Sequence, residues 1–128
     1  MKYYASKTLH LSFDEAADRF TKALSEQGFG VVSRVNLSDK IKEKVGKDMP
    51  EYTIFGACNP ALAWEALQVD DKIGIMLPCN FIVQQKDSDT VEVAIVDPAV
   101  ALQPVDNPAL QPISDMAREK LINALESL

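Results

Sequence analysis

The stretch from residue 72 to residue 97 constrains the fold more than any other part of the sequence. In its first half every second side chain is apolar, which predicts a strand with one apolar face; these positions are Ile73, Ile75, Leu77, Cys79, Phe81 and Val83. The polar segment KDSD at residues 86–89 predicts a turn, and TVEVAIVD at residues 90–97 predicts the returning strand. A hairpin pairs its two strands antiparallel, so the sheet must contain antiparallel strands.

The clearest helix is expected at residues 12–28. Ser12 and Glu15 have the spacing of a capping box, in which each side chain can bond a free backbone N–H at the helix start. Gly28 is a typical stop. Apolar residues also recur at helical spacing on one face; they are Phe13, Ala16, Ala17, Phe20 and Leu24.

Weaker signals place the remaining elements. We expect strands at residues 3–11, 29–35 and 51–58, and helices at residues 38–46, at residues 59–67 and from about Ser114 onward. Ser38 is a favoured cap for the short helix that Gly46 ends. An earlier start of the last helix, capped by Asn107, would place Pro112 where it kinks the helix.

Four prolines between residues 98 and 112 predict a largely irregular segment, with one helical turn after Asp97. The resulting order is β-α-β-α-β-α-β-β-α. It predicts an α+β fold in a single domain over residues 1–128, with a mainly antiparallel sheet and helices packed on one face.

Composition excludes several classes of function. A chain of 128 residues has the length of one domain. Its net charge is −6, and the one lysine-rich segment, residues 40–47, is interrupted by Glu43, so we expect no nucleic-acid partner. No apolar run approaches the roughly 20 residues of a membrane span, and residues 1–16 lack the apolar core of a signal peptide. We therefore expect a soluble cytoplasmic protein whose cysteines are thiols.

The two cysteines of the chain, Cys58 and Cys79, are each followed by an asparagine, Asn59 and Asn80. Two neighbouring thiols can form a reversible disulfide, bind a soft metal ion, or carry a persulfide with a resolving partner. The sequence has no CxxC motif and a single histidine, His10. It therefore predicts no four-ligand zinc site and identifies no cofactor.

Cys58 is expected at the end of a strand, one residue before the cap of the next helix. Asn59 is a favoured cap, and Pro60 suits the first helical position. The positive end of a helix favours a thiolate, which would lower the pKa of Cys58 and raise its nucleophilicity. The alternative is a small buried residue at a tight turn, since cysteine is among the most buried side chains.

Cys79 lies on the apolar face of its expected strand, which favours an inert core thiol. Pro78 argues for a break or bulge there, because proline cannot donate to a sheet ladder. Such a break could present Cys79 beside Cys58, with Asn80 on the opposite face bonding backbone or a ligand.

The helix at residues 59–67 is apolar on more than one side, and it contains Trp64. Either it is deeply buried or it contributes to a contact between subunits. We therefore expect a homo-oligomer, with a dimer favoured, that associates through Trp64 or through the last helix.

Four segments together are similar to one family of small prokaryotic proteins, the domain of unknown function 302 family. They are YTIFGACNPALAWEAL at residues 52–67, IGIMLPCNFIV at 73–83, VAIVDP at 93–98 and NPALQPI at 107–113. The resemblance implies a TATA-binding-protein-like α+β fold with a curved antiparallel sheet and helices on one side. It implies no reaction, and it draws attention to Gly56, Cys58, Asn59, Pro60, Pro78, Cys79 and Asn80.

Three functions remain open from the sequence. The leading one is a binding module for a small molecule or a soft metal ion, with its site around Cys58, Asn59, Cys79 and Asn80. The second is a thiol-dependent redox or sulfur-transfer enzyme with Cys58 as nucleophile and Cys79 as resolving partner. The third is a structural or interaction protein whose cysteines belong to the core.

Overall fold

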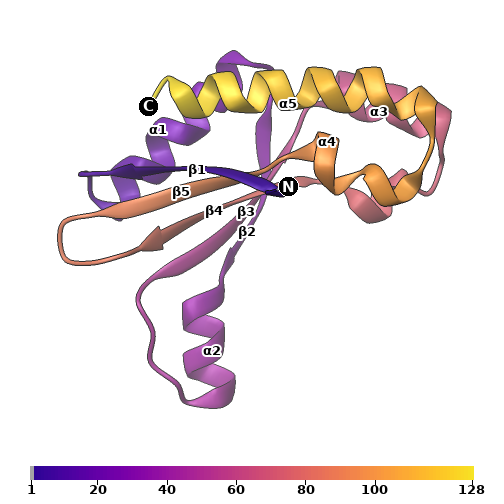
Figure 1. Cartoon of the computed structure of the whole chain (residues 1–128). Helices are drawn as coiled ribbons and strands as arrows, with labels where there is room; N and C mark the ends of the chain where they lie inside the picture. The colour runs from indigo at the N-terminus through magenta and orange to yellow at the C-terminus, as the bar shows by residue number, and fades with distance from the viewer. Residues whose placement is uncertain (1) are drawn as a thin grey trace.

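The computed structural model describes residues 2–128. Its centre is one five-stranded sheet in the order β1-β5-β4-β3-β2, with every neighbouring pair antiparallel. The sheet is open, and its strands fan out across the molecule (Figure 1). The strands are β1 (Tyr4–Leu9), β2 (Gly30–Asn36), β3 (Tyr52–Cys58), β4 (Cys79–Gln85) and β5 (Val91–Val96).

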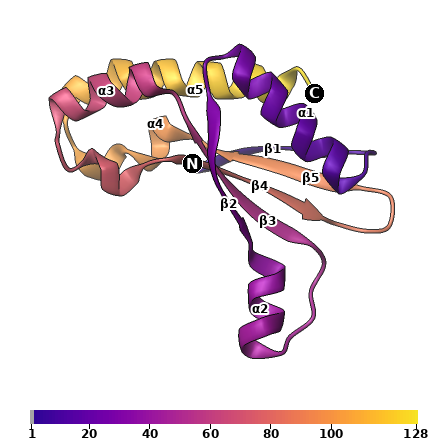
Figure 2. The ribbon, with the colours of Figure 1, turned by 180° about the vertical axis from the view of Figure 1, so that it is seen from behind.

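Three of the helices lie together on one side of the sheet, and a fourth points away from it. The layer consists of α1 (Phe13–Glu26), α3 (Pro60–Val69) and α5 (Gln111–Glu126), as both views show (Figures 1 and 2). The helix α2 (Leu37–Val45) projects from the far ends of β2 and β3 (Figure 1). Within residues 2–128 no helix combines the length and apolar character that a membrane crossing needs.

These elements confirm the α+β fold and the order expected from the sequence. The additional pieces are short: α4 (Pro98–Ala101) and the 3-10 turns η1 (Ile73–Met76), η2 (Gln103–Val105) and η3 (Pro108–Leu110). As expected, Asp97 starts one helical turn, accepting a hydrogen bond from the Ala99 N–H at 3.0 Å.

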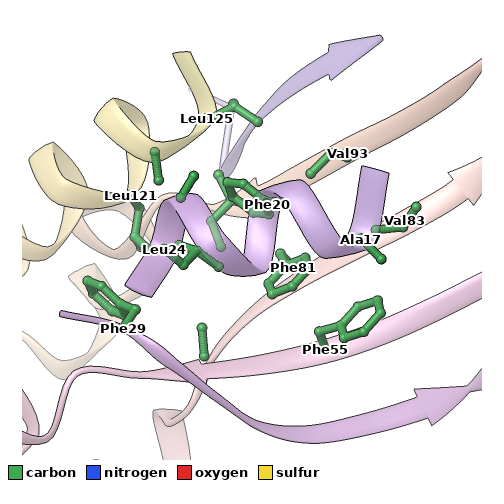
Figure 3. Packing of buried hydrophobic residues seen from close by; sticks show 14 of the residues in the cluster. Ala17, Phe20, Leu24, Phe29, Phe55, Phe81, Val83, Val93, Leu121 and Leu125 are labelled. Atoms are coloured by element: carbon green, nitrogen blue, oxygen red, sulfur yellow. The ribbon is translucent and has the colours of Figure 1, made fainter. Parts of the chain in front are cut away.

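The core lies between the sheet and the helices α1 and α5. The rings of Phe55 on β3 and Phe81 on β4 stack at a centroid distance of 4.7 Å, and Phe20 of α1 meets Phe81 edge-on at 4.8 Å (Figure 3). Leu121 of α5 is fully buried in the same cluster. The apolar face that the sequence predicts for α1 therefore anchors the helix layer to the middle of the sheet.

The ends of α1 follow the expected signals. The Ser12 hydroxyl accepts a hydrogen bond from the Glu15 N–H at 3.1 Å. At the other end Gly28 has a φ of +83°, a conformation that glycine adopts without the steric cost of a Cβ atom. The cap at Ser12 and the stop at Gly28 are confirmed, but the expected reciprocal bond is not, because the Glu15 carboxylate accepts the Ser12 hydroxyl at 3.4 Å in place of a backbone N–H.

The expected strand at residues 72–85 is correct only from Cys79 onward. Residues Ile73–Met76 form η1, whose backbone bonds include Ile73 N–H to Asp70 O and Leu77 N–H to Gly74 O. Ile73 is 1% exposed while Ile75 is 82% exposed, so these two residues do not share one face. Alternation over a few residues fits a strand and a tight turn equally well, and here the turn forms.

Two further predictions about caps were wrong. The last helix begins at Gln111, so Pro112 lies in its first turn, where the missing N–H has no helical partner to lose and no kink results. Asn107 instead caps η3 through the Ala109 N–H. Ser38 does not cap α2; its hydroxyl accepts the Tyr52 N–H at 3.0 Å and thereby ties α2 to β3.

Trp64 is 64% exposed, and in α3 only Leu62 and Ala66 are buried. The deep burial considered for this helix is therefore wrong. A subunit contact through Trp64 stays a prediction.

Candidate functional site

The junction between β3 and α3 carries the first Cys-Asn pair. β3 ends at Cys58 and α3 begins at Pro60. Asn59 lies between them with an extended backbone, and its side-chain oxygen accepts a hydrogen bond from the Leu62 N–H at 3.2 Å. The prediction that Asn59 caps this helix and that Pro60 is its first residue is confirmed.

Asn59 makes a second contact that the sequence did not suggest. Its Nδ2 donates to the carbonyl oxygen of Gln27, the residue that ends α1, at 3.5 Å. Gly28 lies directly beside this amide, and a Cβ atom there would come 3.0 Å from Asn59 Nδ2. One side chain therefore joins the end of α1 to the start of α3, which are 32 positions apart.

Both cysteines line one small cavity of about 50 Å³. They belong to neighbouring strands, and Ala57 is the residue paired with Cys79, so the two cysteines are offset by one position. Neither forms a disulfide, and both are partly exposed. The structure thus places Cys58, Asn59 and Cys79 around the same space.

The rest of the cavity wall comes mostly from residues outside the two Cys-Asn pairs. Leu62 and Ala66 of α3 form one side, and Leu102, Ile113 and Ala117 near the C-terminal end form another. These are ordinary apolar core residues, and only the tertiary packing brings them to the thiols. The wall is therefore almost entirely apolar.

Ser114 is the one hydroxyl residue in this wall. Its Oγ donates to the Gln111 carbonyl oxygen at 3.1 Å, within the same helix. A ligand in the cavity would therefore find the cysteines as its principal chemically reactive neighbours.

Burial in these surroundings, together with the smaller effect of the nearby Cys58, raises the pKa of the Cys79 thiol to about 11. An apolar environment disfavours the charged thiolate, and a second thiolate close by disfavours it again. Cys79 is consequently a neutral thiol at neutral pH. This is the behaviour of a core thiol, the interpretation that the sequence favoured for it.

Asn80 lies on the other side of the sheet. Asn80 is paired with Gly56 of the neighbouring strand β3, and its side chain is exposed. It does not line the cysteine cavity, but it lines a neighbouring cavity of about 210 Å³ together with Cys79 and Met76. The two Cys-Asn pairs therefore differ in geometry, although they match in sequence.

Gly56 and Pro78 have a packing relationship that explains both residues. Gly56 is buried between Ser33 of β2 and the ring of Pro78. A Cβ atom at residue 56 would lie 2.5 Å from Pro78 Cγ and closer still to Ser33 Oγ. The chain can bring Pro78 over β3, directly before Cys79, because residue 56 has no side chain.

Other ligand types are not assembled around the thiols. Within residues 2–128, no group of three or more His, Cys, Asp or Glu side chains is placed to hold a metal ion. His10 lines a different depression, with Glu15 and Asp87. A cysteine–histidine pair of the kind found in thiol hydrolases is thus not formed with His10.

Comparisons with known proteins agree on one family. A family model described as domain of unknown function DUF302 matches residues 5–128. A crystal structure of an uncharacterized conserved protein DUF302 from Bacillus stearothermophilus is similar over 98% of each chain, with a TM-score of 0.90 and 24% sequence identity. No curated protein matches the chain. The structural likeness at this identity concerns the fold.

Proposed function

Because this chain belongs to the DUF302 family, whose description names no activity, we propose from its own residues that it is a binding module for a soft cation. The site is the cavity lined by Cys58, Asn59 and Cys79. The observation that carries the proposal is that the two cysteines of the chain, 21 residues apart in sequence, line one cavity without being bonded to each other.

The size of the cavity selects the kind of ligand. A water molecule needs roughly 10–15 Å³ of such space, so about 50 Å³ holds an ion or a group of a few atoms. Most organic metabolites are larger. Thiolates are soft ligands that suit Cu(I), zinc and iron–sulfur clusters, and of these Cu(I) accepts a site of two sulfur ligands. A cation of this class matches both the donors and the volume.

The electrostatics predict how such an ion would bind. The Cys79 thiol is protonated at neutral pH because burial raises its pKa to about 11. A cation between the sulfurs would reverse this by stabilising both thiolates, and the two thiol protons would leave as it binds.

The test is a titration of the reduced protein with Cu(I), without oxygen, against a coloured chelator that reports the free ion. We expect one ion per chain in the wild type and no competition with the chelator in Cys58→Ser or Cys79→Ser. Asn80→Ala is the matched control, because it changes the residue next to Cys79 on the opposite side of the sheet. Equal binding by a variant that lacks both cysteines would refute the proposal.

A thiol enzyme is the second candidate, and the position of Cys58 at the end of β3, before the cap of α3, favours it. The raised pKa of Cys79 argues against rapid exchange at that residue. Alkylation separates the candidates. A Cys58 that reacts quickly in the native protein and forms a reversible disulfide with Cys79 supports the enzyme. Two thiols that react only in denaturant, with no Cu(I) bound, support a purely structural role.

A further inference from the structure

The side of the sheet that faces away from α1 and α5 carries an apolar row. Cross-strand partners point to the same face, and the pairs Ala94–Ile82, Ile82–Ile54 and Ile54–Val35 run from β5 to β2. We call these four residues the outer stripe. An antiparallel sheet with one face in water normally places polar residues there. An apolar row across four strands therefore indicates a face that another surface covers.

This face is hollow rather than flat. A depression of about 480 Å³ lies over it, and its floor includes Ile82 and Ala94 of the outer stripe. Tyr4 and Tyr52 form part of its walls, with Glu92 on the floor beside them. A concave surface that combines apolar residues with tyrosines and polar side chains fits a convex, amphipathic partner such as a helix.

Within residues 2–128, the helix α2 packs only lightly against the rest of the chain, through Ser38 and β3. In α2 only Ser38 is buried, and the helix projects away from the layer of the other helices (Figures 1 and 2). Leu37, Ile41 and Val45 follow one another at four-residue spacing, which places them along one side of α2. Val45, at its end, is 63% exposed. The residues that line the depression include none from α2.

We propose that a second copy of this chain inserts its α2 into the depression on the outer face of the sheet. The lengths agree: nine residues of helix span about 13 Å, and the outer stripe crosses three strand spacings, about 14 Å. The side with Leu37, Ile41 and Val45 lies on the outer stripe. The lysines at residues 40, 42 and 44 then surround the contact.

Charge favours a copy of the same chain as the occupant. Residues 37–50 contain four lysines and three acidic residues, whereas the whole chain has a net charge of −6. Residues 37–50 are thus slightly basic, whereas the rest of the chain, which provides the depression, is acidic. Glu92 lines the depression, where it lies 3.8 Å from Lys86 Nζ and accepts a hydrogen bond from Gln84, and a lysine from residues 37–50 of the second copy would join this polar cluster.

A reciprocal exchange also supplies enough contact area. One short helix in one depression is a small contact compared with the about 800 Å² per partner of a standard interface, so by itself it would associate only weakly. In a two-fold dimer each copy contributes both its α2 and its depression, so the contact occurs twice. Two copies of one chain provide this doubling without any further surface.

The experiment measures mass in solution by sedimentation velocity at several protein concentrations. We expect a dimer for the wild type and monomers for Val45→Asp on α2 and for Ile82→Arg on the outer stripe. Ile75→Asp is the matched control, because Ile75 is 82% exposed and lies in η1, outside both surfaces; it should remain a dimer. A cooperative thermal unfolding transition, measured for each variant at the same protein concentration, verifies that the monomeric variants are folded.

The decisive experiment mixes the two monomeric variants. Val45→Asp retains an intact depression and Ile82→Arg retains an intact α2, so one of the two contacts can form between them. A heterodimer that is weaker than the wild-type dimer supports the exchange. The proposal is overturned by a wild type that stays monomeric, by a dimer that survives Val45→Asp, or by a dimer that only Trp64→Glu disrupts.

Discussion

The ring of Pro78 occupies the space that a side chain at Gly56 would need. Pro78 directly precedes Cys79, and Gly56 lies in β3, the strand that ends at Cys58. A methyl group at residue 56 would lie 2.5 Å from Pro78 Cγ. Gly56 belongs to the motif GACNP, and Pro78 belongs to the motif LPCN. The two motifs therefore pack against each other across β3 and β4, and both also contribute residues to the cysteine cavity.

We expect Gly56→Ala to lower the free energy of unfolding by about 1–3 kcal/mol, because the added methyl group overpacks a buried position. Ser33 can rotate its hydroxyl away, whereas the proline ring has little freedom to move. Gly30→Ala is the control: no atom lies within 4 Å of its added Cβ, so it should change stability by less than about 0.5 kcal/mol. Urea denaturation measures both. Equal small effects would show that Pro78 yields easily.

Asn59→Ala should destabilise the fold by about 1–2 kcal/mol, because it removes the cap of α3 and the bond to Gln27 together. Asn59→Asp separates the two roles. It keeps an acceptor for the Leu62 N–H but places a carboxylate oxygen against the Gln27 carbonyl oxygen. We expect denaturant midpoints in the order wild type, Asn59→Asp, Asn59→Ala. An Asn59→Asp protein as stable as the wild type would mean that the Gln27 contact contributes nothing.

The raised pKa of Cys79 predicts a loss of stability in alkaline solution. Below pH 9 the thiol is protonated in both the folded and the unfolded chain. As the pH rises from 9 toward 11, the unfolded thiol ionises while the folded one does not, so the free energy of unfolding falls. The fall attributable to Cys79 is at most about 3 kcal/mol.

Lysines and tyrosines titrate in the same pH range, so the measurement is the difference between the wild type and Cys79→Ala. We expect the stability advantage of the wild type over this variant to shrink steadily above pH 9. A difference that is constant from pH 8 to pH 11 would contradict the raised pKa.

Asp97 connects α4 to the last helix, α5, and both helices contribute residues to the cavity wall. Its carboxylate accepts the Ala99 N–H at the start of α4 and the Arg118 Nε–H of α5 at 2.8 Å. We expect Asp97→Ala to cost about 1–2 kcal/mol of stability through the lost cap. Asp97→Asn retains the cap acceptor and should cost less. Thermal unfolding compares them, and identical losses would show that the cap is unimportant.

The local signals in the sequence were reliable where one short motif decides the structure. Ser12 and Asn59 cap helices, Gly28 ends one, and Asp97 starts a helical turn. In each case the partner is a backbone group within four residues, so no distant part of the chain is needed. The α+β fold followed from these signals together with the hairpin.

The errors occur where distant contacts decide. Ile73–Met76 alternates like a strand, yet Ile73 packs against Ala66 and Leu110 while the chain turns. Ser38 has a cap position in the sequence, but its hydroxyl bonds Tyr52.

For the candidate site, the segments GACNP and LPCN contain six of the residues around the cavity, including both cysteines, whereas Leu102 and Ala117 belong to no motif. Asn80 resembles Asn59 in sequence but points to the other face. Side chains alternate between the two faces along a strand, so the residue at which β4 begins decides which face Asn80 occupies.

The order of the strands also governs the assembly of the sheet. β4 and β5 form a local hairpin, but β1 pairs with β5, with Tyr4 opposite Val96 and Leu9 opposite Val91. To pair these strands, the whole chain between β1 and β5 must close into a loop, which costs entropy. Contacts between residues so far apart in sequence slow folding. During synthesis β1 emerges from the ribosome first and must wait for β5 before it can pair. The first strand to be made is therefore among the last to be incorporated, and until then the edge of β5 is open to pairing with other nascent chains.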